Sequence, residues 1–406
     1  MKVLFITHGY PPVKKFGAAL SSRLICEYLT NKGYDLDIFV YDKSENRSKY
    51  KKHGLGEIFK GEDLQLFKKD SDYAEISDGD YDIIHQYGGK YKGRIAYKFK
   101  NFTETKVVST LNGPTPPLIC KGKRYDPESR FCCRAPKDMY CSAKSDFWGE
   151  RDYKYNPVKG IRDYIKYKVD KHVLRYYDRL FPQSQWLSRL FEKSGVPSEK
   201  LKVIPNFYDP NFFERVKKAE NLNLNKDGKI DVLYVGRIIE AKGIMHLLKA
   251  FKMIESDEVR LTLLGSGELE EDVREFIQKN DMDQVNFEGL VPYEDIHEYY
   301  LKSDIFVHPC KYPTEAFNRT LTEAALAKNA MIVSDAGTSP EIVGEDGLVY
   351  EKGDIEDLAG KLKTLIKDED LREELQDKIY EKVRKKYSIE NVMKMVEKEY
   401  FDLIGE

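Results

Sequence analysis

Short apolar runs alternate along this chain with segments in which apolar residues recur every three or four positions. In the first half, the pattern predicts a helix over residues 18–31 and short strands at 2–7, 36–41, 82–85, 106–111 and 202–204. Apolar runs of this length, separated by amphipathic helices, are typical of a parallel sheet with helices on both faces.

The alternation restarts near residue 230 and is more regular from there. Strands are predicted at 231–234, 260–264, 285–287, 305–308 and 331–334, with helices at 245–253, 269–278, 293–301 and 321–327. From residue 354 onward the pattern is nearly all helical. We therefore predict an α/β protein built from two Rossmann-like, doubly wound domains that face a cleft.

Two interruptions of this rhythm set the predicted domain boundaries. Residues 112–157 are rich in Pro, Gly, Cys, Lys and Arg and have no clear period, which predicts a long irregular insertion. Residues 209–229 are polar and rich in Asn and Lys, which favours a linker. The first domain would then cover 1–208 and the second 230–385.

Length and composition agree with this organisation. A chain of 406 residues has room for two or three domains of about 100–200 residues each. No stretch approaches the roughly 18 consecutive apolar residues that span a membrane. The N-terminal apolar run is too short for a signal peptide and lacks a small-residue cleavage site, so we expect a cytoplasmic protein.

Charge is distributed unevenly along the chain. Residues 1–200 hold 38 Lys and Arg against 26 Asp and Glu, a net charge of +12, whereas the remaining residues have a net charge of −14. A basic half suits an anionic partner, such as a phosphorylated acceptor or an anionic membrane surface at the inner face. Attraction between the two domains across their cleft explains the asymmetry equally well, and both explanations stay open.

In open α/β sheets, ligands bind at the carboxyl ends of the strands, and four loops of the second half follow predicted strands. In the first of these loops, Gly236 lets the backbone approach a phosphate, and Arg237 and Lys242 add two cations. Arg binds phosphate oxygens through a planar fork and Lys acts as a point charge, so the loop suits a diphosphate. Taken alone, one Arg and one Lys on a loop are also compatible with an ordinary solvated surface.

The second and fourth of these loops have structural explanations. The turn Gly265-Ser266-Gly267 opens a helix, where a phosphate can bind, but it lacks the third glycine and the acidic residue of a dinucleotide fingerprint. We favour a tight strand-to-helix turn there. The fourth loop, residues 337–342, reads as a helix start set by Pro340, and its role in shaping a pocket stays open.

The third of these loops, residues 315–323, leads into a helix predicted to start near Thr320. The free N–H groups of a first helical turn favour a bound phosphate. Glu315 and Glu323 flank that position, and carboxylates accept hydrogen bonds from sugar hydroxyls. Thr320 and Glu323 also fit a helix capping box, which needs no ligand. Since the capping box does not account for Glu315, that residue is the stronger functional candidate.

Taken in order, the four loops resemble glycosyltransferase family 4, the large retaining group with the GT-B fold. In the second half the matching text is VLYVGRIIEAKG, LTLLGSGELEEDV, HPCKYPTEAFNRTLTEAALAKNAMIVSDAGTSPEIV and GLVYEKGD. In the first half it is MKVLFITHGYPPVKKFGAAL, YDIIHQYGG and VIPNFYD. The resemblance implies an acceptor-binding N-terminal domain, a C-terminal domain that binds a nucleotide sugar, and a C-terminal helix over 386–406 that packs back on the first domain.

The resemblance also implies roles for matching residues. Arg237 and Lys242 would neutralise the donor diphosphate, Glu315 would lie near the transferred sugar, and Glu323 would bind the ribose hydroxyls. The loop of Gly17 would close on the donor. The remaining donor-binding candidates are Gly236, Asn318, Arg319, Thr320 and Leu321. The family implies retention of configuration, a UDP- or GDP-sugar donor, a glycan or lipid-linked acceptor, and no required cofactor or metal.

Three positions depart from the family pattern. Phe16-Gly17 stands where a double glycine is usual, and Asn318 stands where a glycine usually follows Phe317. Asn112 lies in the stretch where the family often has a histidine; it can contact a sugar hydroxyl or a phosphate but cannot shuttle protons. Asn112 and Asn318 keep a catalytically inactive donor-binding module open as an alternative, and a nucleotide-sugar epimerase on the same fold is a second alternative.

The predicted insertion holds Cys120, Cys132, Cys133 and Cys141. Four clustered thiols can hold a structural metal, but no C-x-x-C pair is present, so free thiols or a disulfide are favoured. Basic and aromatic residues alternate over 154–177, a pattern that also occurs on nucleic-acid-binding surfaces. Because no nucleic-acid module accompanies it, we expect no nucleic-acid partner. A peripheral membrane surface, an anionic-acceptor surface or a solvated helix face remain open.

Overall fold

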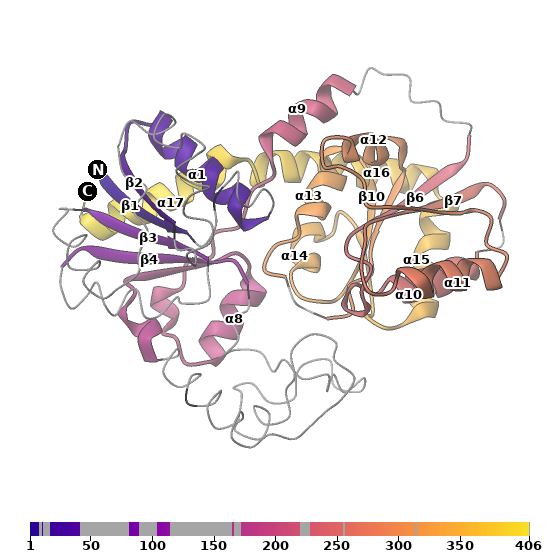
Figure 1. Ribbon diagram of the computed structural model, residues 1–406, viewed down its shortest axis with the longest axis horizontal. Coiled ribbons are helices and arrows are strands. Elements are labelled where there is room, and N and C mark those ends of the chain that lie inside the picture. The colour runs from indigo at the N-terminus through magenta and orange to yellow at the C-terminus, as the bar shows by residue number, and fades with distance from the viewer. Residues whose placement is uncertain are drawn as a thin grey trace. The chain divides into compact units, whose positions relative to one another are not determined.

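The computed structural model describes residues 1–7, 10, 17–40, 81–88, 104–113, 165, 172–219, 228–254, 256–312 and 315–405. The four insertion cysteines lie outside these residues, as does most of the basic and aromatic segment. The chain forms two compact units, Met1–Pro205 together with Met393–Glu406, and Asn206–Val392 (Figure 1). Each unit is described below by itself.

The first unit is built on a parallel sheet with the strand order β2-β1-β3-β4-β5. Its strands are β1 (Lys2–Thr7), β2 (Asp35–Val40), β3 (Ile83–Tyr87), β4 (Lys106–Leu111) and β5 (Arg179–Pro182). Its described helices include α1 (Ala18–Asn31) and α8 (Gln185–Lys193). The order reverses between β1 and β3, which is the flavodoxin-like arrangement of a doubly wound sheet.

The segment after α8 differs from its prediction. Residues 202–204 do not form a strand; only Leu201 pairs with Leu180, as an isolated bridge. The N–H groups of Lys202 and Ile204 still donate to the carbonyls of Leu180 and Pro182. The segment is therefore extended beside β5 without continuing the sheet, and Pro205 follows directly.

The second unit holds a parallel sheet with the strand order β11-β10-β9-β6-β7-β8. Its strands are β6 (Ile230–Val235), β7 (Val259–Leu264), β8 (Val285–Gly289), β9 (Ile305–His308), β10 (Ala330–Ser334) and β11 (Leu348–Tyr350). Counted along the chain from β6, this is the 3-2-1-4-5-6 order of the Rossmann fold. The order reverses between β6 and β9.

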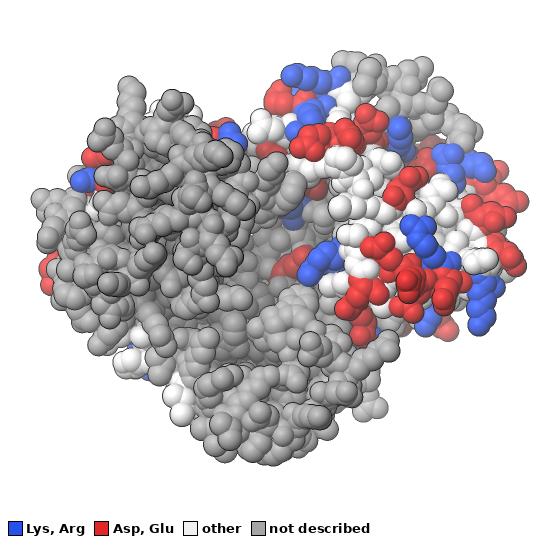
Figure 2. All heavy atoms as spheres, viewed as in Figure 1, with Lys and Arg blue, Asp and Glu red and all other residues white. Residues whose placement is uncertain are grey.

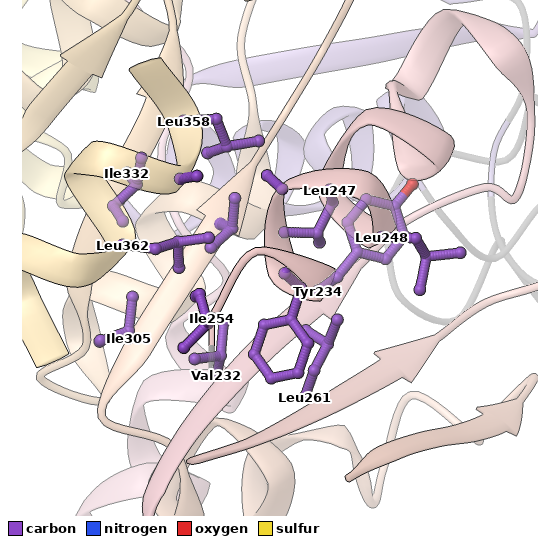
Figure 3. Packing of buried hydrophobic residues seen from close by; sticks show 14 of the residues in the cluster. Val232, Tyr234, Leu247, Leu248, Ile254, Leu261, Ile305, Ile332, Leu358 and Leu362 are labelled. Atoms are coloured by element: carbon purple, nitrogen blue, oxygen red, sulfur yellow. The ribbon is translucent and has the colours of Figure 1, made fainter. Parts of the chain in front are cut away.

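Helices cover both faces of the second sheet. They are α9 (Pro210–Ala219), α10 (Ile244–Lys252), α11 (Glu270–Lys279), α12 (Ile296–Lys302), α13 (Arg319–Leu326), α14 (Ser339–Val343), α15 (Ile355–Lys367) and α16 (Glu369–Lys386). Successive strand residues point to opposite faces. Val232 and Tyr234 of β6 therefore pack with α10 and α15, as Figure 3 shows, whereas Leu233 and Val235 pack with α9, α12, α13 and α16. The prediction of two doubly wound α/β domains is confirmed for the sheets and their flanking helices.

Helix α9 lies within the segment that polar composition assigned to a linker, residues 209–229. Phe212, Phe213 and Val216 of this helix are buried in the core of the second unit. Their spacing of one, three and four positions gives an apolar stripe on an otherwise charged helix. The first part of the expected linker is therefore a packed element of the second unit, and residues 220–227 lie outside the described part.

The final helix, α17 (Ile389–Ile404), is shared between the two units, and its residues from Met393 onward belong to the first. Tyr400 hydrogen-bonds to the buried ring of His85 on β3. Glu397 accepts hydrogen bonds from Tyr28 and Tyr34, at 3.2 and 3.0 Å. The C-terminal residues are thus held against the N-terminal sheet by a tertiary polar network.

Two properties of the surface bear on the expected partners. Within the described residues, no helix combines the length and apolar character needed to cross a bilayer. Figure 2 shows acidic and basic side chains interspersed over the described surface of the second unit. Most of the first unit's lysines and arginines between residues 41 and 171 lie outside the described residues, so the proposed anionic-partner surface is not located.

Candidate functional site

The loops after β6 and β9 begin at adjacent strands of the second sheet. The two strands pair in parallel through Val232 with Ile305 and Leu233 with Phe306. Because the strand order reverses between them, their following segments lead to opposite faces of the sheet, and the carboxyl edge at such a reversal is where ligands bind in open α/β sheets. The loop after β6 carries Gly236, Arg237 and Lys242, and the loop after β9 leads to Glu315.

Lys242 and Glu315 form an ion pair through the Lys242 Nζ and Glu315 Oε1. The Lys242 side chain is only 8% exposed, whereas that of Glu315 is 33% exposed. Burial alone would raise the pKa of Glu315, but Lys242, His308 and Arg237 together bring it below its ordinary value. Glu315 is therefore held as a carboxylate beside a buried ammonium group.

Arg237 lies on the same loop and is exposed. The buried hydroxyl of Tyr234 fixes the backbone of this loop, because it donates to the Arg237 carbonyl at 2.8 Å. The N–H of Gly236 donates to the Leu264 carbonyl at 3.0 Å. The structure thus places two of the three predicted charged residues, Lys242 and Glu315, in contact, with Arg237 close enough to lower the pKa of Glu315.

His308, the last residue of β9, is a buried neighbour of this ion pair that the sequence analysis did not single out. Burial and the charge of Lys242 lower the pKa of His308 to about 3, so its ring is neutral near pH 7. Neither ring nitrogen has a hydrogen-bond partner among the described residues. The signal in the sequence was a single polar residue closing an otherwise apolar strand, Ile305–His308.

Glycines allow the loops of this edge to pack against one another. Gly243 has φ of +71°, and a Cβ there would lie 1.8 Å from the Pro309 carbonyl oxygen. At Gly265, with φ of +137°, a Cβ would lie 1.8 Å from the Gly236 carbonyl oxygen. Gly243 therefore permits the close approach of the β6 and β9 loops, and Gly265 that of the β6 and β7 loops.

The turn at Gly265-Ser266-Gly267 is explained by this packing. Ile238 donates to the Ser266 carbonyl at 2.9 Å, and a Cβ on Gly267 would lie 2.4 Å from the Ile238 carbonyl oxygen. The N–H of Gly267 donates to the carboxylate of Glu270 at 2.8 Å, at the start of α11. The Gly267 N–H is thus hydrogen-bonded to the protein's own Glu270. This agrees with the interpretation of the segment as a tight strand-to-helix turn.

Helix α13 begins at Arg319, with Asn318 as its N-cap residue. Asn318 makes no side-chain cap; its amide instead donates to the Ser339 hydroxyl at 2.8 Å, at the start of α14. Thr320 and Leu321 lie in the first turn of α13, where backbone N–H groups have no partner within the helix. The capping box predicted for Thr320 and Glu323 is wrong, because the helix starts one residue before Thr320.

Glu323 is buried at 4% exposure on the second turn of α13. Its two carboxylate oxygens lie 3.1 Å from the Tyr293 hydroxyl and 3.0 Å from the Tyr300 hydroxyl. Burial raises the pKa of Glu323, with Asp209 adding to the rise, while Arg319 and the two tyrosines partly oppose it. The two glutamates of the predicted site thus have opposite environments: the pKa of Glu315 is lowered and that of Glu323 is raised.

Gly17 and Asn112 belong to the first unit. Gly17 is the N-cap residue of α1, with φ of +64°, and a Cβ there would meet nothing within 4 Å. Asn112 follows β4, and its side chain lies against Gly88, whose own Cβ would fall 2.4 Å from the Asn112 Nδ2. Both residues follow strands at the carboxyl edge of the first sheet.

His85 lies within β3 rather than at its end, and it is fully buried. Its ring nitrogens contact the Tyr400 hydroxyl and the Thr110 hydroxyl. Burial lowers its pKa to about 3. These contacts are those of a structural histidine, so His85 is a poor substitute for the histidine that the family often has near Asn112. Cys26 and Cys310 are likewise buried free thiols.

Comparison with known proteins gives matches over most of the chain. The family described as "Glycosyl transferases group 1" matches residues 216–385, and the family described as "Glycosyltransferase Family 4" matches residues 17–212. The chain is similar to the capsular polysaccharide biosynthesis glycosyltransferase CapM of Staphylococcus aureus, at 27% identity over 63% of this chain and 70% of that protein.

Two archaeal relatives come from Methanocaldococcus jannaschii. The uncharacterized glycosyltransferase MJ1178 is 30% identical over 57% of this chain and 68% of its own length. The uncharacterized glycosyltransferase MJ1607 is 28% identical over 49% of this chain, and the alignment spans only about half, 53%, of that relative.

Solved structures share the fold at low identity. Anabaena Alr3699/HepE in complex with UDP superposes with a TM-score of 0.70 at 16% identity, over 99% of this chain and 100% of that one. Sucrose-phosphate synthase from Thermosynechococcus elongatus gives a TM-score of 0.68 at 17% identity, over 100% of this chain and 99% of that one. Each superposition covers both units of the chain.

Proposed function

The chain belongs to the group 1 and family 4 glycosyltransferases with the GT-B fold, and from that membership we propose that it transfers a sugar from a nucleotide-sugar donor with retention of configuration. The donor site lies in the second unit, at the reversal point between β6 and β9. The acceptor is a glycan or a lipid-linked glycan. The first unit, Met1–Pro205 with Met393–Glu406, binds that acceptor.

The Lys242–Glu315 ion pair is the observation that carries this proposal. An ammonium group that is nearly buried costs free energy unless a partner compensates it, and in this structure Glu315 is that partner. Arg237 adds a second, exposed cation on the same loop. A diphosphate arriving here meets two cations, Arg237 and Lys242, and the N–H groups of the first turn of α13, which have no partner within the helix.

This arrangement suits stabilisation of the leaving diphosphate. As the bond from the sugar to the diphosphate breaks, negative charge grows on the phosphate oxygens. Cations and helix dipoles that are already in place stabilise that charge without reorganisation. Glu315, kept ionised by Lys242, is positioned to accept hydrogen bonds from hydroxyls of the transferred sugar.

The donor is proposed to be a UDP- or GDP-sugar, and no metal or cofactor is proposed. HepE was solved as a complex with UDP and also as a complex with UDP-glucose, which supports UDP as the first nucleotide to test. The name of CapM refers to capsular polysaccharide, and a Salmonella relative is named as a lipopolysaccharide N-acetylglucosaminetransferase. These names support an acceptor of surface-glycan type.

We place the reaction in the cytoplasm at the inner face of the membrane, where a lipid-linked acceptor and the +12 charge of residues 1–200 would meet an anionic surface. Co-sedimentation with anionic vesicles at low and at high salt tests this placement. Binding at low salt that is lost at high salt supports it, and no binding at low salt removes it.

The activity is tested by incubating the protein with a panel of UDP- and GDP-sugars, with and without glycan and lipid-linked acceptors, and measuring nucleotide release. Release that depends on the acceptor, with a product of the same anomeric configuration as the donor, supports the proposal. A free epimer without acceptor favours the epimerase alternative, and binding without turnover favours an inactive donor-binding module. Glu315→Gln should lower turnover strongly, whereas Lys249→Ala, a surface change on α10, should not.

A further inference from the structure

One phenol oxygen in the second unit lies between two carboxylates. The Tyr293 hydroxyl is 3.2 Å from Oδ2 of Asp209 and 3.1 Å from Oε1 of Glu323. Asp209 is 3% exposed and Glu323 is 4% exposed, so water does not readily separate these groups. The second oxygen of Glu323 faces the fully buried hydroxyl of Tyr300.

The Tyr293 hydroxyl has a single proton, so it cannot donate a full hydrogen bond to both Asp209 and Glu323 if both are ionised carboxylates. Burial raises the pKa of Tyr293, with Glu323 and Asp209 adding to the rise, so the phenol is neutral and has one proton to donate. That proton serves one carboxylate. The other oxygen–oxygen contact would be repulsive unless the second carboxyl group carries a proton of its own.

The environments of the two carboxyl groups identify which one is protonated. Oδ1 of Asp209 accepts from the Asn211 N–H at 3.0 Å, in the first turn of α9, where the helix dipole favours negative charge. Glu323 lies instead among aromatic rings, and burial followed by the charge of Asp209 raises its pKa. The proton therefore belongs on Glu323, which donates to the Tyr293 oxygen, while Tyr293 donates to Asp209.

The other charged and polar groups around Glu323 do not change which carboxyl group carries the proton. Arg319, on the same helix, is the cation among the described residues that acts to lower the pKa of Glu323. Arg215 of α9 lies over the ring of Tyr293, 5.3 Å from its centroid, rather than against either carboxyl group. Tyr300 of α12 donates to Glu323 whether or not that residue is protonated.

We propose that Tyr293 is a positioning residue that keeps Glu323 as a neutral carboxylic acid in the unliganded protein, and that binding of a nucleoside diphosphate releases this proton. The inference rests on the proposed function and on the role that the family resemblance implies for Glu323, which is to bind the ribose hydroxyls. The two hydroxyls of a ribose donate best to an ionised carboxylate. On binding, the O–H bond of Glu323 breaks, its proton passes to the solvent buffer, and the ribose hydroxyls take over as donors to the carboxylate.

Donor affinity is then linked to pH. Since the ligand prefers the deprotonated form, the affinity for UDP rises with pH, by up to about tenfold per pH unit, until the pH exceeds the pKa of Glu323 in the unliganded protein. Above that pH, affinity becomes flat. Tyr293 and Asp209 together set the pH at which the affinity becomes flat, because the Tyr293 oxygen accepts the hydrogen bond that the protonated Glu323 donates.

Isothermal titration of UDP, repeated with GDP, in two buffers of different ionisation enthalpy measures the proton release directly. The titration is run between about pH 5.5 and 8. The wild type should release up to one more proton per bound nucleotide than Glu323→Gln releases. The amide of that variant mimics the neutral acid and cannot ionise, so it also corrects for protons that the diphosphate itself releases.

Two further variants separate positioning from general packing. Tyr293→Phe should shift the pH at which affinity levels off, whereas Tyr350→Phe should titrate as the wild type. Tyr350 is a matched control, because it is a buried tyrosine of the same unit whose hydroxyl has no hydrogen-bond partner among the described residues. Glu323→Gln should unfold at a temperature close to that of the wild type, since it keeps both hydrogen bonds of a protonated Glu323; a large drop would contradict the protonated state.

The outcomes distinguish this inference from the proposed function. Nucleotide binding with equal proton release in the wild type and Glu323→Gln, and with a flat pH profile, overturns the inference and leaves the donor site standing. A folded wild-type protein that binds neither UDP nor GDP at any of these pH values overturns the donor site and the inference with it.

Discussion

Lys242 and Glu315 are 73 residues apart in the chain and form an ion pair at the point where the strand order of the second sheet reverses. Lys242 comes from the β6 loop and Glu315 from the segment after β9. Because the two strands are neighbours, the pair follows from the topology of the sheet as well as from the two residues. Arg237 is on the same loop as Lys242, but its side chain is exposed whereas that of Lys242 is nearly buried.

Removing Lys242 should affect both stability and donor binding. In Lys242→Ala the half-buried carboxylate of Glu315 loses its cation, which should lower the free energy of unfolding by about 1–3 kcal/mol. Arg237→Ala removes an exposed group and should change it by less than about 0.5 kcal/mol. Chemical denaturation of both variants, with Lys249→Ala as a surface control, makes the comparison. Equal stability of Lys242→Ala and Lys249→Ala would contradict the compensating role of the ion pair.

The same pair predicts an acid limit. Because the folded protein lowers the pKa of Glu315 below its ordinary value of 4.5, the stabilisation is present above about pH 4.5 and is lost as the pH falls through the lower folded value. Lys242→Ala should remove this part of the acid sensitivity. A pH profile of thermal unfolding that has the same shape in the wild type and in Lys242→Ala would argue against it.

The close packing of the β6 loop predicts intolerance of a methyl group at two glycines. Gly243→Ala and Gly265→Ala each place a Cβ 1.8 Å from a backbone carbonyl oxygen, at positive φ. Both should lower the midpoint of thermal unfolding by several degrees or prevent folding. Gly360→Ala is the matched control, since Gly360 lies exposed within α15 and a methyl group added there would meet nothing within 4 Å. It should be neutral or stabilising by about 0.5–1 kcal/mol.

Two buried histidines predict a further loss of stability on mild acidification. The pKa values of His85 and His308 are lowered to about 3, mainly by burial, whereas an ordinary histidine titrates near 6.5. Since the fold favours their neutral form, the stabilisation is full above pH 6.5 and falls as the pH drops toward 3. Between pH 6.5 and 5, each should contribute about 2 kcal/mol to the loss.

Urea denaturation at pH 7.5 and pH 5 measures this loss. His85→Gln and His308→Gln should each make the difference between the two pH values smaller. His172→Gln replaces an exposed histidine and should leave the difference as in the wild type. An unchanged difference in both buried-site variants would show that the two rings are protonated in the folded protein or are open to solvent.

Regular elements with an unbroken period were predictable from the sequence. The strand at 2–7 and the helix at 18–31 have the predicted bounds, because each apolar pattern ends at a clear polar or glycine stop. Helix α9 was missed because the polar and Asn-rich composition of 209–229 outweighed the short stripe of Phe212, Phe213 and Val216. A stripe of three residues becomes decisive only when a core is present to receive it.

For the candidate site, the sequence was sufficient to predict which residues belong to it but not which side chains they contact. The sequence indicated that Arg237, Lys242 and Glu315 belong to one anion-binding edge, and the ion pair agrees with this grouping for Lys242 and Glu315. The environment of Glu323 was misjudged, since a shift of one residue in the start of α13 changes which side chain can cap it. Tyr293, Tyr300 and Asp209 reach Glu323 only through tertiary packing, which no local pattern reveals.

In the proposed function, the β6 and β9 loops of the second unit bind the diphosphate of a nucleotide-sugar donor. Titration calorimetry of UDP and GDP with the wild type, Arg237→Ala, Lys242→Ala and Lys249→Ala measures this binding. We expect one of the two nucleotides to bind the wild type and Lys249→Ala equally, and to bind the other two variants at least about tenfold more weakly, a loss of about 1.4 kcal/mol or more. Equal affinity in all four proteins, or no binding of either nucleotide by the folded wild type, would contradict the claim.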